Sequence, residues 1–499
     1  MRKTINFLIN NFKVKAGTLI ALTAVAYGLL INNLNLWTDE IYSVLMAKES
    51  LSDMWILLVS EDSKPPLYYL YLKGILTLFP AQYEIWAAHF ASAVLLIAAQ
   101  IFAATIIRRD FGDNVSLWCI VLLALIPQSL WLALEVRTYM LSSLLLLIAA
   151  VYGWHLINQP KNLDFIIFGV VSLCALYTHY YCAIWLMFCY MGILYYLIKD
   201  KTFSKYGIKF LITAVMVALL FLPWLYVPFA NGSDISSSWY VNESFVLYSW
   251  QFFINPLQPE IFQSVFLIAT TFSACVFSFI LLLGVFDLSA KKSKRIFVLT
   301  FGCFITSYLL LILLSYTFRP MVTARYLKIF TLVLYLAGAV VLAQHKNIRK
   351  AFALTAIIGF IFTWADIRAI SFDKGYQNVI NDIRRFISPS QPLIALDNSN
   401  IFCEYYLPEY KCLPIIGETG EILRKPSIAK LASDYQYQFD NVAYTISIYN
   451  QPISEADCQT YQSFYRYGQN VSLCRFSPEN AHNLLKDSLY WIQKRVVAP

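Results

Sequence analysis

Long apolar runs recur along this chain and constrain its fold more than any other feature. Segments such as "AGTLIALTAVAYGLLI", "AAHFASAVLLIAAQIFAATII" and "IFVLTFGCFITSYLLLILLSY" approach or exceed the roughly 18 residues that indicate a membrane-spanning helix. Of the 499 residues, 59% are hydrophobic and 14% are charged, whereas soluble domains contain about 25% charged residues. The sequence therefore predicts an α-helical polytopic membrane protein.

About eleven transmembrane helices are expected, and their predicted starts lie near Gly17, Ile85, Val115, Tyr139, Leu163, Cys182, Ile208, Phe262, Ile296, Tyr326 and Phe352. The segment from Pro65 to Phe79 is apolar, but it is short and contains Lys73. We interpret it as a helix at the membrane interface rather than a span. The first run is longer than the roughly 7–15 apolar residues of a cleaved signal peptide, which favours an uncleaved span.

Basic residues alternate from one inter-span segment to the next. One set contains "MRKTINFLINNFKVK", "RRD", "PKN", "KDKTFSKYGIK", "KKSKR" and "HKNIRK", and the opposite set is poor in Lys and Arg. Cytoplasmic loops carry the excess of basic residues, so we expect a cytoplasmic N-terminus and Asp39 on the outer side. The net charge of +8 is thereby explained by loop charges, and nucleic acid is not expected as a partner.

The composition changes after the last apolar run, which divides the chain into a transmembrane domain (1–370) and a C-terminal domain (371–499). In the second part, "QPLIALD" and "NVAYTISIYN" predict strands and "GYQNVINDIRRFI" predicts an amphipathic helix. With an odd number of spans before it, this α/β domain is expected to be extracytoplasmic. Its role is open between binding an acceptor, covering a cavity and acting as a structural cap.

Four of the ten cysteines lie in the C-terminal domain: Cys403, Cys412, Cys458 and Cys474. An even number of cysteines outside the cytoplasm favours disulfides, and their spacing does not match the close C-x-x-C pairs of a zinc site. Four cysteines allow three pairings. Proximity in the sequence favours Cys403–Cys412 and Cys458–Cys474.

Polar residues gather at the predicted outer ends of the spans. Glu135 and Arg137 lie between two apolar runs with almost no loop, so they must face a cavity or a partner rather than lipid. Several outer cations favour an anionic ligand such as the phosphate of a lipid carrier. Asp39 would then remove a proton from an acceptor hydroxyl. Adjacent residues of a helix do not share a face, so one of Asp39 and Glu40 is expected to be structural or to position substrate.

The order of five motifs resembles that of the GT-C glycosyltransferases. These motifs are "WTDE", "SKPPLYYL", "EVRTYML", "THYY" and "RPMVTARYL", and they extend over about the first 370 residues. The pattern is most similar to the bacterial branch related to protein O-mannosyltransferases (family 39) and to the transferase that adds aminoarabinose to lipid A.

The resemblance implies an inverting transfer of a sugar from a polyprenyl-phosphate carrier to a lipid, glycan or protein acceptor. The reaction would take place on the outer face of the bacterial plasma (inner) membrane. By similarity, Asp39 would be the general base within the motif that also contains Glu40. The residues expected at the donor phosphate are Lys64, Arg137, Tyr139 and Arg325.

A divalent metal ion is left open by the resemblance, and no other cofactor is implied. Some relatives have an acid before the lysine of the "KPP" motif, whereas Ser63 fills that position here, which disfavours a metal. His179 and Asp62 are the candidates for contact with substrate or metal. The alternatives for His179 are a ligand, a hydrogen-bonding partner of the donor, and an ordinary histidine at the end of a span.

Two further functional classes compete with the transferase. A transporter or flippase of lipid-linked sugars would need polar residues near the middle of the membrane, whereas the ionisable residues here lie towards one face. A non-catalytic scaffold for the C-terminal domain would leave the acidic pair and the Glu135–Arg137 segment unexplained.

Overall fold

The computed structural model divides the chain into two compact units. The first unit contains Met1–Asn32 and Lys64–Ile367, and the second contains Asn33–Ser63 and Arg368–Pro499. The structure describes residues 11–62, 64–230, 244, 247–248, 264–288, 290–318, 320–371, 375–391, 393–395, 399–414, 443–447, 457–461 and 471–476. The sequence assigned residues 33–63 to the transmembrane domain, whereas the structure groups them with the C-terminal residues.

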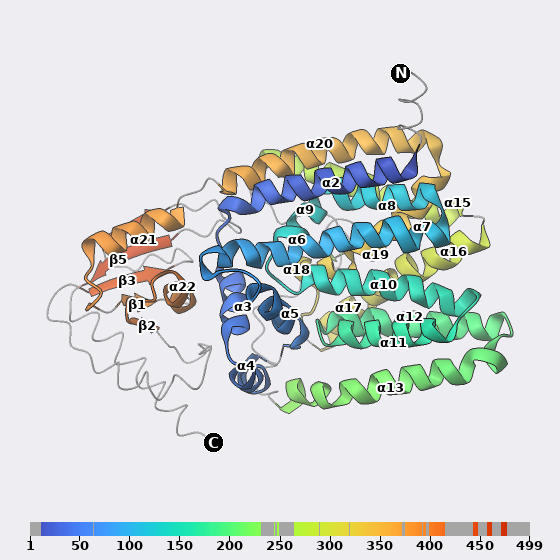
Figure 1. Ribbon diagram of the computed structural model, residues 1–499, viewed down its shortest axis with the longest axis horizontal. Coiled ribbons are helices and arrows are strands. Elements are labelled where there is room, and N and C mark those ends of the chain that lie inside the picture. The colour runs from blue at the N-terminus through green and yellow to red at the C-terminus, as the bar shows by residue number, and fades with distance from the viewer. Residues whose placement is uncertain are drawn as a thin grey trace. The chain divides into compact units, whose positions relative to one another are not determined.

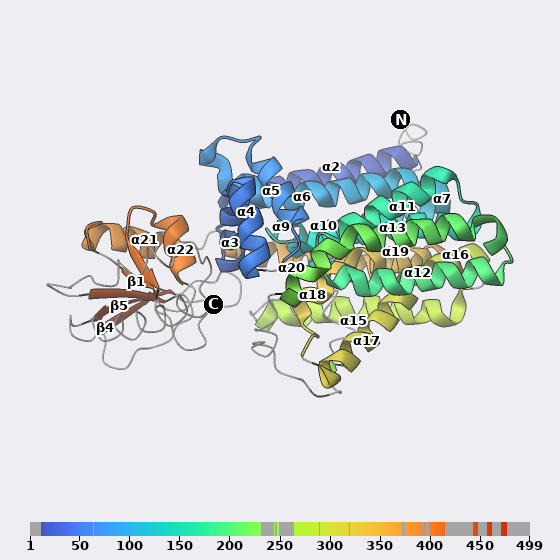
Figure 2. The same ribbon diagram turned by 90° about the horizontal axis from the view of Figure 1, so that it is seen from below.

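The long helices of the first unit run side by side in one bundle (Figure 1, Figure 2). Its elements are α2 (Phe12–Leu30), α5 (Leu67–Leu76), η3 (Ala81–Tyr83), α6 (Glu84–Phe102), η4 (Ala103–Ile107), α7 (Arg108–Phe111), α8 (Asp113–Leu125), α9 (Pro127–Leu134), α10 (Tyr139–Asn158), α11 (Asn162–Leu176), α12 (Tyr181–Lys199), α13 (Phe203–Ala230), α15 (Ser264–Asp287), α16 (Lys291–Phe297), η6 (Val298–Gly302), α17 (Cys303–Thr317), α18 (Ala324–Leu327), η7 (Lys328–Phe330) and α19 (Thr331–Gln344). The short η1 (Ile31–Asn33) and the long α20 (Lys346–Ser371) each extend across the boundary between the units.

Within the described residues, nine helices are long and apolar enough to cross a membrane, and the number is ten if α8 and α9 form one bent span. The apolar helix α11 is shorter, with 15 residues. Each of the eleven predicted spans therefore corresponds to helical structure, and the polytopic membrane class is confirmed. The segment interpreted as an interfacial helix contains α5, which has only 10 residues.

Burial separates core helices from peripheral helices in the first unit. The apolar windows of α10 and of the α18–α19 segment are 83% and 89% buried, whereas those of α13 and α20 are 28% and 22% buried. The peripheral helices expose large apolar side chains such as Ile208 and Leu354. A water-soluble protein would not tolerate so much exposed apolar surface, so this surface is suited to lipid.

The bend between α8 and α9 begins at Pro127 and measures 66°. Proline has no backbone N–H and disfavours helical geometry in the residue before it, which ends α8.

At the other end of α9, side chains from α6 act as hydrogen-bond donors to backbone carbonyl groups that have no partner within the helix. His89 Nδ1 donates to the Leu134 carbonyl at 2.5 Å, and the Ser92 hydroxyl donates to the Glu135 carbonyl. Buried non-helical backbone is thereby tolerated between α9 and α10.

The second unit contains a mixed five-stranded sheet with helices. Its elements are α3 (Thr38–Lys48), α4 (Leu51–Leu57), η2 (Leu58–Asp62), α21 (Gly375–Phe386), β1 (Leu393–Ala395), α22 (Ser399–Tyr406), β2 (Cys412–Pro414), β3 (Ala443–Ser447), β4 (Asp457–Tyr461) and β5 (Val471–Phe476). The strand order is β2-β1-β3-β5-β4. Strand β1 pairs in parallel with β2 and β3, and β5 pairs antiparallel with β3 and β4.

The secondary structure predicted for the C-terminal residues agrees with these elements. α21 coincides with the predicted amphipathic helix, and Val379, Ile380 and Ile383 form its buried stripe. β1 and β3 lie within the two predicted strand segments. The extracytoplasmic location of this region stays a prediction.

The cysteines of the second unit form two groups. Cys474 in β5 is disulfide-bonded, and the strand register places it opposite Cys458 of β4. The register supports the predicted Cys458–Cys474 pairing, although the side chain of Cys458 lies outside the described residues. Cys403 and Cys412 are free thiols rather than the predicted disulfide, and burial, with a contribution from Cys412, raises the pKa of Cys403. The fold brings these two thiols together, but forming the bond would also require an oxidant.

Candidate functional site

The four residues expected at a donor phosphate lie at helix ends of the first unit. Lys64 precedes α5, Arg137 lies between α9 and α10, Tyr139 begins α10, and Arg325 belongs to α18. His179 lies in the short connection between α11 and α12. Apart from Arg137 and Tyr139, these positions are widely separated in the sequence, so only packing of the helices can bring the side chains together.

The pKa of His179 indicates that two of these cations lie near it. Burial, and then the positive charges of Arg137 and Lys64, lowers the pKa of His179 from 6.5 to about 3. The imidazole is therefore neutral at pH 7. Its Nδ1 accepts a hydrogen bond from the backbone N–H of Tyr181 at 3.2 Å, so Nε2 carries the proton and is a neutral hydrogen-bond donor.

Tyr139 connects His179 with the remaining cations. Its ring centroid lies 6.0 Å from that of His179, and the charges of Arg137 and Arg325 both act on its hydroxyl group. Tyr326, next to Arg325, places its ring 5.3 Å from His179. Tyr139 is only 1% exposed, and its hydroxyl has no hydrogen-bond partner among the described residues.

Lys328 is a member of this group that the sequence analysis did not identify. Its Nζ lies 3.4 Å from Oε2 of Glu135 and 5.9 Å from the centroid of the Tyr139 ring. Lys328 and Glu135 are both almost fully buried. The sequence does contain a sign of this residue's role, since Lys328 lies within the apolar run "YLKIFTLVLYLAG". An ionisable residue inside a membrane span requires a partner.

We refer to Lys64, Arg137, Arg325 and Lys328, with Glu135, Tyr139 and His179, as the cationic cluster. It combines four cations with one carboxylate, and Tyr139 and His179 add neutral donors. Phosphate oxygens accept hydrogen bonds from guanidinium, ammonium and hydroxyl groups, and such charge-assisted bonds are strong. The cluster is therefore suited chemically to a phosphate-bearing ligand.

The acidic pair Asp39–Glu40 lies in the second unit, in the first turn of α3. Glu40 is fully buried, and its Oε2 accepts a hydrogen bond from the backbone N–H of Trp37 at 3.2 Å. This bond caps the helix N-terminus. Asp39 is partly exposed. Of the two residues predicted as catalytic, Glu40 is thus enclosed within the protein, whereas Asp39 retains exposed surface.

The segment before α3 is held by the C-terminal part of the second unit. The hydroxyl of Tyr406, in α22, accepts from the Leu36 backbone N–H at 2.9 Å and donates to the Leu36 carbonyl at 3.2 Å. Lys48 of α3 lies over the ring of Tyr405. These contacts fix the backbone three residues before Asp39, which the sequence analysis did not anticipate.

The sequence left a metal ion open but disfavoured it. The described residues contain no group of three or more His, Cys, Asp or Glu side chains able to hold a metal ion. Asp62 is the last residue of η2, and its side chain lies outside the described part of the chain. Because Nδ1 of His179 accepts a backbone hydrogen bond, its other nitrogen is protonated and unsuited to bind a metal.

No protein-family model and no curated protein matches this chain. Among solved structures, ArnT from Cupriavidus metallidurans bound to undecaprenyl phosphate matches with a TM-score of 0.55 and 13% sequence identity, covering 92% of this chain and 97% of ArnT. ArnT from the same organism in the apo state matches over the same shares, with a TM-score of 0.47. The predicted GT-C-like resemblance is confirmed at the level of the fold. The chain is therefore a polytopic membrane protein with the fold of ArnT.

Proposed function

We propose that the chain is an integral-membrane inverting glycosyltransferase. It transfers a sugar from a polyprenyl-phosphate carrier to a lipid, glycan or protein acceptor of the cell envelope, on the outer face of the plasma membrane. The ArnT structure that shares this fold contains undecaprenyl phosphate, which supports a carrier of this class.

The observation that carries the proposal is the cationic cluster. Its members come from separate helix ends of the first unit, and they combine four cations with a buried tyrosine hydroxyl that has no hydrogen-bond partner among the described residues. Arg137 and Lys328 are buried, whereas Lys64 and Arg325 are partly exposed. Four cations around one carboxylate create a positive potential that favours binding of an anion, and a phosphate of the donor is such an anion.

The proposed reaction separates proton removal from stabilisation of the leaving group. Asp39 accepts the proton of the acceptor hydroxyl as the oxygen of that hydroxyl bonds to the anomeric carbon of the sugar. The bond between that carbon and the phosphate oxygen breaks on the opposite side, which inverts the configuration. Arg137, Lys64 and Arg325 stabilise the negative charge on the departing phosphate. Tyr139 and His179 donate hydrogen bonds to it.

Lipid analysis of cells with and without the protein tests the proposal and identifies the sugar. We expect cells that lack the chain to accumulate one polyprenyl-phosphate sugar and to lose one sugar from an envelope acceptor, both measured by mass spectrometry. A transporter would move the lipid-linked sugar without releasing free polyprenyl phosphate. Unchanged envelope glycans, or translocation without release of the carrier, would therefore contradict the proposal.

Purified variants then test the residues. Asp39→Asn preserves shape and removes the base, so binding of undecaprenyl phosphate should persist while transfer falls by about 10²–10⁴. Arg137→Ala should weaken binding and lower the rate by about 10²–10³. Arg108→Ala is a matched control, because Arg108 pairs with Asp113 at 2.7 Å and lies outside the cationic cluster. Full transfer by Asp39→Asn would remove the proposed base.

A further inference from the structure

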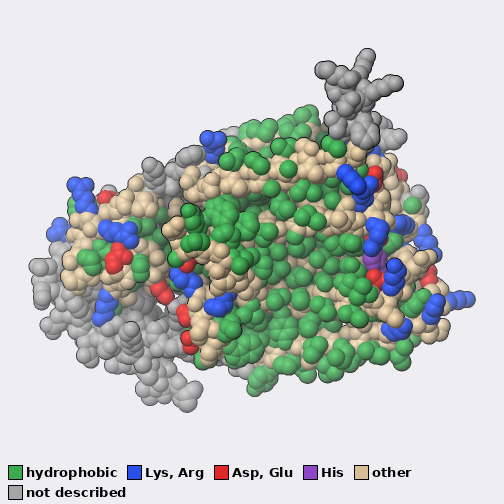
Figure 3. Space-filling model, in the orientation of Figure 1, with side chains coloured by type: hydrophobic (Ala, Val, Ile, Leu, Met, Phe, Trp, Pro, Cys, Tyr) green, Lys and Arg blue, Asp and Glu red, His purple; other side chains and the backbone are tan. Residues whose placement is uncertain are grey.

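A second polar site lies in the first unit, at the end of the bundle where α7 and α16 are found (Figure 1). Figure 3 shows Lys and Arg side chains gathered at this end, beyond the broad apolar band. A cavity of about 690 Å³ lies here, lined by five cations and two carboxylates. Its volume is within the range of about 300–1,000 Å³ that is typical of small-molecule sites.

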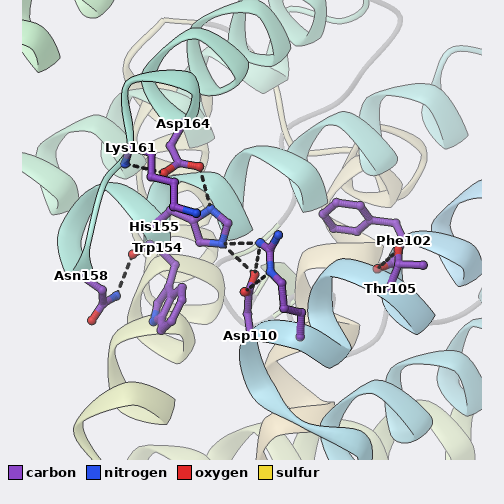
Figure 4. Close-up of polar contacts among 9 residues, drawn as sticks. Phe102, Thr105, Asp110, Trp154, His155, Asn158, Lys161 and Asp164 are labelled. Atoms are coloured by element: carbon purple, nitrogen blue, oxygen red, sulfur yellow. Dashed lines mark hydrogen bonds and ion pairs between the residues drawn. The ribbon is translucent and has the colours of Figure 1, made fainter.

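The two carboxylates of this cavity are already hydrogen-bonded to protein groups. Figure 4 shows His155 between them: its Nε2 lies 2.7 Å from Asp110 and its Nδ1 lies 3.1 Å from Asp164. Asp110 also accepts two hydrogen bonds from Arg109. This network joins α7, α10 and α11. Of the other cations, Lys291 and Arg295 pair with Asp200, which leaves Lys161 and Lys292 available to an anion.

Three donors of the cavity lack an acceptor in the described part of the chain. The ammonium groups of Lys161 and Lys292 form no ion pair there, although Lys292 lies 5.2 Å from the centroid of the Trp154 ring. Trp154 is 8% exposed, and its indole N–H has no hydrogen-bond partner among the described residues. An oxyanion with several acceptor oxygens would pair with the exposed ammonium groups of Lys161 and Lys292.

An apolar surface continues from the cavity along α11. Leu163 lines the cavity and is 61% exposed, and Ile166 and Val170 are exposed on the same face of the helix. A soluble anion would not use this surface, whereas the acyl chain of a lipid would lie along it.

We propose that this cavity binds the phosphate headgroup of an anionic phospholipid, with an acyl chain along Leu163, Ile166 and Val170. Basic pockets between membrane helices are suited to such headgroups. The lipid belongs to the leaflet at this end of the bundle, which the distribution of basic loops predicts to be cytoplasmic. This site is separate from the cationic cluster and does not depend on the proposed reaction.

Native mass spectrometry of the full-length protein in detergent tests the proposal. The probes are dioleoyl phosphatidylglycerol and dioleoyl phosphatidylcholine, which share acyl chains and differ in net charge. We expect the anionic lipid to be retained more tightly. Each cation near an anionic headgroup contributes about fivefold in binding, so the double variant K161Q/K292Q should weaken phosphatidylglycerol binding about 30-fold.

The double variant K199Q/K205Q is the matched control, since both lysines are exposed and neither lines the cavity. It should leave lipid binding unchanged. If the first double variant fails to fold, K161Q alone should still weaken binding about fivefold. Equal retention of the two lipids, or an equal loss in the control, would overturn the proposal. Binding of soluble glycerol phosphate as tightly as phosphatidylglycerol would instead identify a site for a soluble anion.

Discussion

Replacing Lys328 by methionine should lower the free energy of unfolding by about 3 kcal/mol. Lys328 and Glu135 are 3% and 1% exposed, and removing one partner of a buried pair costs about 3–5 kcal/mol. Their separation of 3.4 Å exceeds the roughly 2.7–2.9 Å of the strongest charged hydrogen bonds. We therefore expect the lower end of the range. Methionine preserves most of the side-chain volume, so a cavity adds little.

A double-mutant cycle isolates the pair. Glu135→Gln should be destabilising by itself, and the double variant should cost less than the sum of the two single variants, with a coupling of about 2 kcal/mol. Lys209→Met is the matched control, because this lysine is exposed and, among the described residues, hydrogen-bonds only to Asn162. Its effect should be within about 0.5 kcal/mol, as for other surface substitutions.

The assay is equilibrium unfolding in mixed micelles of detergent and SDS, followed by tryptophan fluorescence and checked by refolding. Two results would refute the reasoning. One is strictly additive single variants, which would mean that the two side chains do not interact. The other is a loss of less than about 0.5 kcal/mol in Lys328→Met, the level of an exposed residue.

Three more predictions address the pH response, the second unit and its thiols. The pKa of His179 is about 3 in the folded protein, below its ordinary value of 6.5, so the unfolded state binds a proton at a higher pH than the folded state does. The free energy of unfolding should therefore decrease as the pH falls from 6.5 towards 3. His179→Gln should reduce this decrease, measured by melting curves at each pH. Tyr406→Phe removes two hydrogen bonds to backbone before α3, and should lower transfer severalfold while undecaprenyl phosphate binding by native mass spectrometry is unchanged. Burial and the neighbouring Cys412 raise the pKa of Cys403, so iodoacetamide should label Cys403 only after unfolding, and Cys474 only after reduction as well.

The spans could be predicted from sequence because each depends on a local run of apolar residues. Hydropathy averages over one window, and every predicted span coincides with helical structure. The bend at Pro127 was not predicted, although the proline that causes it is visible in the sequence. α11 shows a second limit, because its 15 residues are apolar enough for a span but shorter than the length that spans usually need.

The types of residue in the candidate site could be predicted from the sequence, but which of these residues pair with each other could not. Charged residues between apolar runs marked Arg137 and Glu135, since such residues cannot face lipid. Lys328 was missed because one lysine at the start of a long apolar run was read as part of the span. The roles of Asp39 and Glu40 could not be divided from the sequence beyond the rule that adjacent helical residues face different ways.

The sequence by itself determined the membrane class and the positions of the helices, because these follow from properties summed over neighbouring residues. Only the tertiary structure decided that Glu135 pairs with Lys328, 193 residues away, and that Tyr406 holds Leu36, 370 residues away. It also placed Asn33–Ser63 in the unit of the C-terminal sheet. Such contacts depend on how helices and strands pack, and no local window contains both partners.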